Sequence, residues 1–233
     1  MKKLLIASTS TVHGSTYLEY IETALAEFFK DIQTIVFVPY ARPGGITHDA
    51  YTEIAQNGFE KIGKKVVGLH TFDNPVEAIE SAEAVFTGGG NTFLLVTQLY
   101  KNEVMAPLRT RIFEGMPYFG TSAGANITGL TMQTTNDMPI VYPPSFKTLG
   151  AVPFNINPHY LDPDPTSTHK GETRETRIKE FHTINTQAVV GLREGSWLEV
   201  QGDEIILKGQ LPARIFEQNK TPYELESGSK VKV

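Results

Sequence analysis

The most constraining feature of this sequence is the alternation of short apolar runs with amphipathic segments through its first half. The apolar runs have the length of buried strands, and they are residues 4–7, 34–38, 65–69, 84–86 and 118–121. Apolar side chains recur at helical spacing between them, and Thr47 and Asn74 stand at typical N-cap positions. Strands that alternate with helices favour a mostly parallel sheet. We therefore predict an α/β fold of three layers (α/β/α), with helices on both faces of the sheet.

The second half of the chain is less regular. Its predicted elements are strands at residues 152–156 and 188–192, a helix at 173–182, and short β runs at 197–200, 204–207 and 214–216. Residues 201–203 read Gln-Gly-Asp, which indicates a β hairpin near the C-terminus. No repeat or linker divides the sequence, so we expect residues 1–233 to form a single domain. The polar residues from about 225 to 233 are expected to fray.

The composition excludes several classes of protein. The chain has no cysteine, which rules out disulfides, thiolate zinc sites and a cysteine nucleophile. A net charge of −5 at pH 7 disfavours nucleic-acid binding, because nucleic-acid binders concentrate Lys and Arg. No apolar stretch approaches the roughly 18 residues of a membrane helix, and the run at residues 4–7 is too short for a signal-peptide core. We therefore expect a cytoplasmic protein with no membrane or nucleic-acid partner.

Residues 120–124 read Gly-Thr-Ser-Ala-Gly and match the pattern G-x-S-x-G, with Ser122 at its centre. The pattern alone is common, but here an apolar run leads into it and small residues follow it. A strand, a sharp turn and a helix start are typical of a nucleophile elbow, which exposes the serine hydroxyl at the carboxyl edge of a sheet. In that setting the N–H of Ala123 faces a developing oxyanion. The alternative is a Gly/Ser turn without chemistry.

A second glycine-rich turn, Gly88-Gly89-Gly90-Asn91, ends the preceding apolar run. It lacks the Lys-Ser/Thr pair of a P-loop and the spacing of a dinucleotide fingerprint, so it does not indicate a nucleotide cofactor. Because it ends the strand before the serine strand, an N–H of Gly89 or Gly90 is favoured as a second oxyanion donor. The alternative is a turn that only needs backbone conformations open to glycine.

A serine nucleophile needs a base, and the chain has six histidines, which are His13, His48, His70, His159, His169 and His182. His159 ends a predicted strand, and Pro158 before it stiffens the loop. No pair of histidines has the H-x-x-x-H spacing of a metal site, so we expect no metal. The base also needs a carboxylate to hold its tautomer. Asp137 and Glu194 are the candidates for this role; either could be an ordinary turn carboxylate, and the residues alone do not choose between them.

Residues 169–177 form the densest basic cluster of the chain. Arg174 and Arg177 are three residues apart and therefore share a helix face. The usual outcome for such a face is solvation, with neighbouring glutamates as partners. The alternative is that one arginine turns inward and pairs bidentately with a substrate carboxylate.

Six segments, taken together, resemble the peptidase E family of α-aspartyl dipeptidases. They are GGGNTF at 88–93, TSAGAN at 121–126, TTNDMPIV at 134–141, INPH at 156–159, HKGETRE at 169–175 and GLREGSW at 191–197. The resemblance implies a flavodoxin-like fold related to class I glutamine amidotransferases, with serine in place of their cysteine. It also implies a cytoplasmic serine peptidase, without cofactor, that removes an N-terminal aspartate from dipeptides.

The resemblance also implies the roles of individual residues. Ser122 corresponds to the nucleophile and His159 to the base, and the N–H groups of Gly90 and Ala123 would hold the oxyanion. Glu194 is the preferred third member of the triad, because it matches the family's glutamate after the strand.

Four further residues are compared with the same relatives. Asp137 is also described as a charge-relay residue for the family and is kept as a competing third member. The amidotransferases place a glutamate two residues after the histidine, where this chain has Leu161. Arg174 matches the arginine associated with the substrate aspartate, and Asn91 is taken as a second substrate contact.

Three alternatives to an Asp-X dipeptidase remain at this stage. One is a cyanophycinase-like hydrolase, although the short chain and the missing signal peptide count against it. Another is a small-molecule serine esterase, which would not need Arg174. The third is a non-enzymatic flavodoxin-like binding module, which the intact Ser122 and His159 argue against. The expected partner is a small peptide, and the expected state is a monomer or homodimer.

Overall fold

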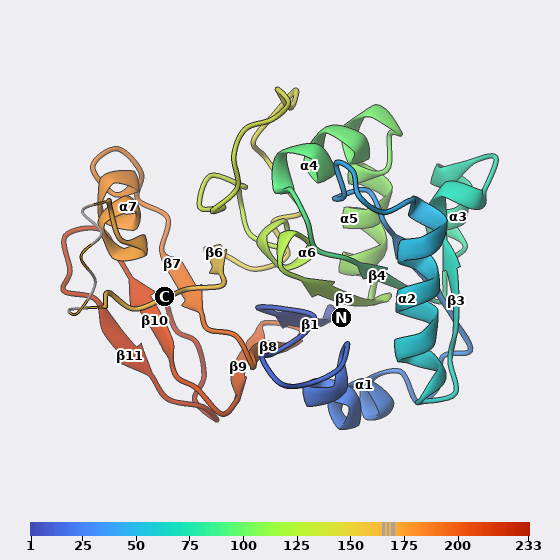
Figure 1. Cartoon of the computed structure of the whole chain (residues 1–233), viewed down its shortest axis with the longest axis horizontal. Coiled ribbons are helices and arrows are strands. Elements are labelled where there is room, and N and C mark those ends of the chain that lie inside the picture. Colours follow the sequence, from blue (N-terminus) through green and yellow to red (C-terminus); the bar gives the residue numbers. More distant parts are fainter. Residues whose placement is uncertain (165, 167, 169–170) are drawn as a thin grey trace.

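The main structural unit is a seven-stranded sheet with the strand order β3-β2-β4-β5-β1-β8-β9 (Figure 1). The computed structural model describes the whole chain except residues 165, 167, 169 and 170. Neighbouring strands from β1 to β5 are parallel, whereas β8 runs antiparallel to both β1 and β9. The strands are β1 (Lys3–Ala7), β2 (Thr34–Val38), β3 (Lys65–Gly68), β4 (Ala84–Thr87), β5 (Pro117–Thr121), β8 (Ser196–Gln201) and β9 (Glu204–Gly209).

Helices cover both faces of this sheet, because the side chains of each buried strand alternate between two apolar clusters. On one face Leu5, Phe37 and Phe119 pack with Tyr51 and Phe59. The helices of this face are α1 (Glu22–Phe28) and α2 (His48–Glu60). The short 3₁₀ turn η1 (Glu19–Ile21) precedes α1.

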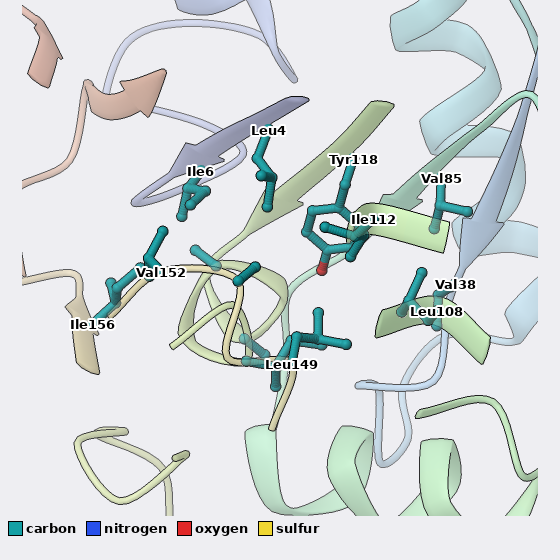
Figure 2. Close-up of a cluster of buried hydrophobic side chains, with 14 of the residues drawn as sticks. Leu4, Ile6, Val38, Val85, Leu108, Ile112, Tyr118, Leu149, Val152 and Ile156 are labelled. Carbon is teal, nitrogen blue, oxygen red and sulfur yellow. The ribbon is translucent and has the colours of Figure 1, made fainter. Parts of the chain in front are cut away.

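The opposite face carries the larger apolar cluster, part of which Figure 2 shows. Leu4, Val85 and Tyr118 project from the strands and pack in one cluster with Leu108 and Ile112 of α5. The helices of this face are α3 (Pro75–Glu80), which follows the 3₁₀ turn η2 (Leu69–Thr71), α4 (Thr92–Lys101) and α5 (Met105–Glu114). The predicted three-layer α/β/α architecture is therefore confirmed.

The helix starts expected at Thr47 and Asn74 are present. The Thr47 side chain accepts a hydrogen bond from the N–H of Ala50, and Asn74 accepts from the N–H groups of Val76 and Glu77. The longest helix in the described part of the chain, α2, has 13 residues. No helix among the described residues is long and apolar enough to cross a membrane.

A second, four-stranded sheet with the order β11-β10-β7-β6 lies beside the first (Figure 1). Its elements are β6 (Asn155–Pro158), β7 (Val189–Leu192), β10 (Ala213–Phe216) and β11 (Tyr223–Leu225), with α7 (Arg174–Phe181) packed on it through Ile178. This second sheet was not predicted, because periodicity identifies a strand but not its partner. The strand predicted at residues 152–156 is also shifted: β6 begins only at Asn155, and Val152 and Phe154 are core side chains of a loop.

The C-terminal tail differs from the frayed segment that its polar composition led us to expect. The N–H of Val231 donates to the carbonyl oxygen of Ile205 at 2.9 Å, and the N–H of Leu207 donates to that of Ser229 at 3.0 Å. β9 is the edge strand of the first sheet, so its outer backbone groups are open to pairing. The tail covers this edge.

Glycines allow a close approach of backbone segments at the carboxyl edge of the first sheet. A Cβ atom on Gly120 would overlap the carbonyl oxygen of Gly124, and one on Gly124 would overlap that of Thr87. Backbone atoms cannot rotate away as a side chain can. The turn between β5 and α6 (Ala123–Asn126) therefore packs directly against the end of β4, and this packing needs residues without a Cβ atom.

We predict that Gly120→Ala lowers the free energy of unfolding by about 2 kcal/mol or more, because the added methyl meets backbone rather than a movable side chain. Urea unfolding followed by circular dichroism measures this change. The matched control is Gly44→Ala, at a position with no heavy atom within 4 Å of the added Cβ. The control should shift the unfolding free energy by less than about 0.5 kcal/mol. Equal unfolding midpoints for the two variants would contradict the packing argument.

Candidate active site

Ser122 lies on the sharp turn between β5 and α6, in the strand–turn–helix setting that the sequence indicates. Its backbone has φ 55° and ψ −111°, which is an uncommon conformation for a residue with a side chain. A Cβ atom on Gly89 would lie 2.8 Å from the Cβ of Ser122, so the glycine-rich turn after β4 is packed against the serine. Strained backbone of this kind is typical of functional sites and persists only where neighbouring contacts hold it.

His159 and Glu194 approach Ser122 from the second sheet. His159 directly follows β6, and its Nε2 lies 2.9 Å from the Oγ of Ser122. Its Nδ1 lies 2.6 Å from Oε1 of Glu194, which is in the turn between β7 and β8. The structure thus brings together Ser122, His159 and Glu194 in one chain of hydrogen bonds.

This chain of contacts has the chemistry of an activated nucleophile. Glu194 accepts a hydrogen bond only if Nδ1 carries the proton, so Nε2 is left as the acceptor that faces the serine hydroxyl. The tautomer is inferred from these partners. The side chains of His159 and Glu194 are 35% and 45% exposed, so the imidazole is open to substrate and water.

Asp137, the competing carboxylate, is engaged elsewhere. Its Oδ2 accepts hydrogen bonds from the N–H and the hydroxyl of Thr92, both at 2.7 Å, and from the hydroxyl of Thr135 at 3.0 Å. It therefore lies at the N-terminus of α4, where the helix dipole favours a negative charge. No hydrogen bond joins Asp137 to His159 in the part of the chain that the structure describes. The structure brings Glu194, and not Asp137, to the histidine.

Asn91 is the N-cap of the same helix. Its Oδ1 accepts a hydrogen bond from the N–H of Leu94 at 3.0 Å, and its Nδ2 donates to the carbonyl oxygen of Met138 at 2.9 Å. One polar end of the Asn91 side chain thus caps α4, and the other fastens the 133–140 loop to this helix. A role in substrate binding is not needed to explain this residue.

Of the two predicted oxyanion donors, Ala123 directly follows Ser122, and Gly90 follows Gly89, which packs against Ser122. The N–H groups of Gly90 and Ala123 donate no hydrogen bond to another described residue. The hydroxyl of Tyr51 donates to the carbonyl oxygen of Gly89 at 3.1 Å. Because a trans peptide holds its C=O and N–H antiparallel, this contact turns the N–H of Gly90 away from Tyr51. Gly90 has φ 141°, which favours glycine at this position.

Arg174 is the first residue of α7 and is half-buried. It lines a groove of about 370 Å³ with Leu161 and Asp162, and no described carboxylate forms an ion pair with it. Burial, helped by the positive charge of Arg177, lowers the pKa of Arg174, and Asp137 partly opposes that shift. An arginine keeps its proton at any ordinary pH, so the lowered pKa marks a partly desolvated cation.

Arg177, the other arginine of the basic cluster, lies on a solvated face. The Nε of Arg177 lies 3.7 Å from a carboxylate oxygen of Glu172, and both side chains are more than half exposed. His169 and Lys170, which the sequence analysis placed in this cluster, lie outside the described residues.

The remaining described histidines are not part of this site. His70 pairs with Asp49 at 2.8 Å, and the ring of His48 packs against that of His70. His182 is half-buried and contacts the carbonyl oxygen of Gln187 at 2.9 Å. Among the described residues, no group of three or more His, Cys, Asp or Glu side chains could hold a metal ion.

Two residues at the site were not identified from the sequence. Ser8 follows β1 and contacts the backbone of His159, and Arg193 precedes Glu194. The Arg193 guanidinium bonds both oxygens of Asp162, at 2.9 and 2.7 Å, and the Glu224 carboxylate at 2.8 Å. The polar run that begins at Ser8 was a usable signal, because the carboxyl ends of parallel strands are where sites form.

Comparisons with known proteins show the family to which the chain belongs. The family model described as peptidase family S51 matches residues 4–208. A protein named peptidase E from Streptomyces coelicolor is 48% identical over 226 residues, which cover 97% of this chain and 92% of that protein. A probable alpha-aspartyl dipeptidase from Drosophila melanogaster is 44% identical over 227 residues, which cover 96% of this chain and 93% of that one.

Solved structures share the fold. A putative peptidase E from Listeria monocytogenes superposes with a TM-score of 0.68 at 23% sequence identity, over 90% of this chain and 98% of the other. A peptidase from an acI-B1 Actinobacterium superposes with a TM-score of 0.71 at 17% identity, over 100% of this chain and 97% of the other. At such identities the likeness supports the α/β fold alone.

Proposed function

The chain belongs to peptidase family S51 and is a serine-type peptidase, and from that membership we propose that it hydrolyses dipeptides with an N-terminal aspartate. The observation that carries the proposal is the chain of hydrogen bonds from Ser122 through His159 to Glu194. A hydroxyl, an imidazole and a carboxylate in this order are what acyl transfer by serine requires. The name of the Drosophila relative supports the aspartyl specificity.

In the proposed acylation step, Oγ of Ser122 attacks the carbonyl carbon of the Asp–X bond while Nε2 of His159 takes the hydroxyl proton. The imidazolium that forms is stabilised by Glu194 at Nδ1. The developing oxyanion is held by the N–H groups of Gly90 and Ala123, and one such donor is worth about 3 kcal/mol of transition-state stabilisation.

The acyl-enzyme is then resolved by the same groups. His159 gives its proton to the leaving amine, the C–N bond breaks, and the aspartyl group stays as an ester on Ser122. His159 next accepts a proton from water, whose oxygen attacks the ester carbonyl carbon. The imidazolium then returns this proton to Oγ of Ser122 as the ester C–O bond breaks and aspartate is released. The partial exposure of the His159 side chain supports this step, because the imidazole is open to water.

Selection of aspartate is assigned to Arg174. The substrate side-chain carboxylate leaves water when it binds, and without a cation partner this would cost several kcal/mol. A guanidinium can bond both carboxylate oxygens at once. Arg174 has no ion-pair partner among the described residues, whereas Arg177 has Glu172.

The first test of the proposal is Ser122→Ala. We expect turnover of Asp-Leu to fall by several orders of magnitude, since the acyl-enzyme cannot form. The circular dichroism spectrum and melting temperature should change little, because a methyl group keeps the space of the serine Cβ. A variant that keeps a tenth of the wild-type kcat would show that Ser122 is not the nucleophile.

The third member of the triad is tested by two isosteric variants, Glu194→Gln and Asp137→Asn. Glu194→Gln removes the charge that stabilises the imidazolium, so kcat should fall at least tenfold with the fold intact. Asp137→Asn should instead weaken the attachment of the 133–140 loop to α4 and lower the melting temperature, with kcat reduced by less than about threefold. A larger loss of kcat in Asp137→Asn than in Glu194→Gln would transfer the role to Asp137.

Specificity is tested by Arg174→Met. It should cut kcat/KM for Asp-Leu strongly and leave any slow cleavage of Asn-Leu and Ala-Leu nearly unchanged, because only the first substrate has the carboxylate. Arg174→Lys should recover part of the loss, since an ammonium supplies charge without the bidentate geometry. Arg177→Met is the matched control and should keep the wild-type ratio of the three substrates. An equal fall for all three substrates in Arg174→Met would mean that Arg174 supports the fold.

A further inference from the structure

Ser8 is a buried residue with two hydrogen-bond partners in the second sheet. It directly follows β1, and its side chain is 0% exposed. Its Oγ accepts a hydrogen bond from the N–H of His159 at 2.8 Å and donates one to the carbonyl oxygen of Leu192 at 2.7 Å. Because water cannot replace either partner at a buried position, the hydroxyl holds both backbone groups in place.

The backbone at Ser8 also reaches the other two members of the hydrogen-bond chain. The carbonyl oxygen of Ala7 accepts a hydrogen bond from the N–H of Ser122 at 3.2 Å, and the N–H of Ser8 donates to the carbonyl oxygen of Ser196 at 3.2 Å. Glu194 lies midway between Leu192 and Ser196 in the sequence. Residues 7 and 8 therefore hold the backbone of the serine, of the histidine and of both flanks of the glutamate.

His159 needs such support because its backbone is in the left-handed region, with φ 53°. This conformation costs a residue with a side chain roughly 1–3 kcal/mol and persists only where the surroundings fix it. The bond from Ser8 is made to the N–H of His159 itself. This hydrogen bond fixes the backbone of His159, and the imidazole that extends from that backbone contacts the Ser122 hydroxyl.

We propose that Ser8 is a positioning residue for the Ser122–His159–Glu194 chain, an inference that rests on the proposed function. Ser8 does not touch the reacting atoms. By fixing the backbone of His159, it sets the distance between the imidazole and the Ser122 hydroxyl. By fixing the backbone of Leu192, it keeps the Glu194 carboxylate within hydrogen-bond distance of Nδ1 of His159. A displacement of about 1 Å between reacting groups can cost a hundredfold in rate.

The test is Ser8→Ala, assayed at a temperature where circular dichroism shows the variant to be folded. We expect kcat for Asp-Leu to fall by about 10- to 100-fold, with KM within about threefold of wild type, because the substrate contacts are untouched. The rate at which a fluorophosphonate probe modifies Ser122 should fall in parallel, since that reaction also needs the aligned base. Ser8→Cys keeps a weak donor and acceptor at the same place and should recover part of kcat.

Thr148→Ala is the matched control for loss of a buried hydrogen bond. Thr148 is 8% exposed, and its hydroxyl donates to the carbonyl oxygen of Gly129 at 2.8 Å, outside the hydrogen-bond chain of the site. It should lose stability but keep the wild-type kcat and probe reactivity. A kcat for Ser8→Ala within twofold of wild type, or an equal fall in Thr148→Ala, would overturn the positioning role.

Two further results separate the possible failures. Ser122→Ala is assayed alongside: if it stays active the proposed function fails, and if it is inactive while Ser8→Ala is normal only the positioning role fails. If Ser8→Ala does not fold, Ser8→Cys replaces it. A kcat for Ser8→Cys equal to that of Thr148→Ala then refutes the role, and a lower kcat with unchanged KM supports it.

Discussion

The distance of 2.9 Å between Ser122 Oγ and His159 Nε2 depends on how two sheets meet, because the serine ends a strand of one and the histidine ends a strand of the other. A hydrogen bond weakens steeply once its donor and acceptor are a few tenths of an ångström too far apart. The junction therefore has to be stiff. Asn126 of α6 stabilises the junction, because its Nδ2 donates a hydrogen bond to the carbonyl oxygen of Ile156 at 2.8 Å. The hydroxyl of Thr134 donates to the same oxygen at 2.9 Å. One short helix thus links the turn of Ser122 to the strand that leads to His159.

Both members of that hydrogen bond have strained backbone, with φ 55° at Ser122 and 53° at His159. Strain of this kind is kept only where packing and hydrogen bonds leave no alternative. At Ser122 close glycine packing fixes the turn, since Gly120 and Gly124 let backbone segments approach without side chains between them. At His159 the constraint is polar, through the buried hydroxyl of Ser8. Ser122 is thus held by close backbone packing together with a hydrogen bond to Ala7, and His159 is held by a hydrogen bond from Ser8, which follows a strand of the first sheet.

Local features of the fold and site were predictable from the sequence, and long-range partners were not. The strand, turn and helix around Ser122 are predicted by neighbouring residues in the sequence, and the same is true of the helix caps Thr47 and Asn74. Asp137 and Glu194 offer the same carboxylate chemistry, and what separates them is a partner far along the chain: Thr92 for one and His159 for the other. The second sheet was not predicted for the same reason: the sequence patterns of β6 and β7 indicate strands but not the sheet that each strand joins.

Arg174 shows how a protein with a net charge of −5 could select a negatively charged substrate. At about 0.1 M salt the Debye length is about 10 Å, so charges spread over the surface are largely screened, whereas a pair in contact is not. Asp137 is near enough to offset part of the desolvation of Arg174, yet its Oδ2 already accepts hydrogen bonds from Thr92 and Thr135. Held in this way, Asp137 supports the charge of the guanidinium without closing on it as an ion pair. Arg174 is half-buried, so part of its hydration is already lost in the free protein. Under the proposed function, binding of a substrate carboxylate would therefore cost less desolvation of the guanidinium than binding to a fully hydrated arginine.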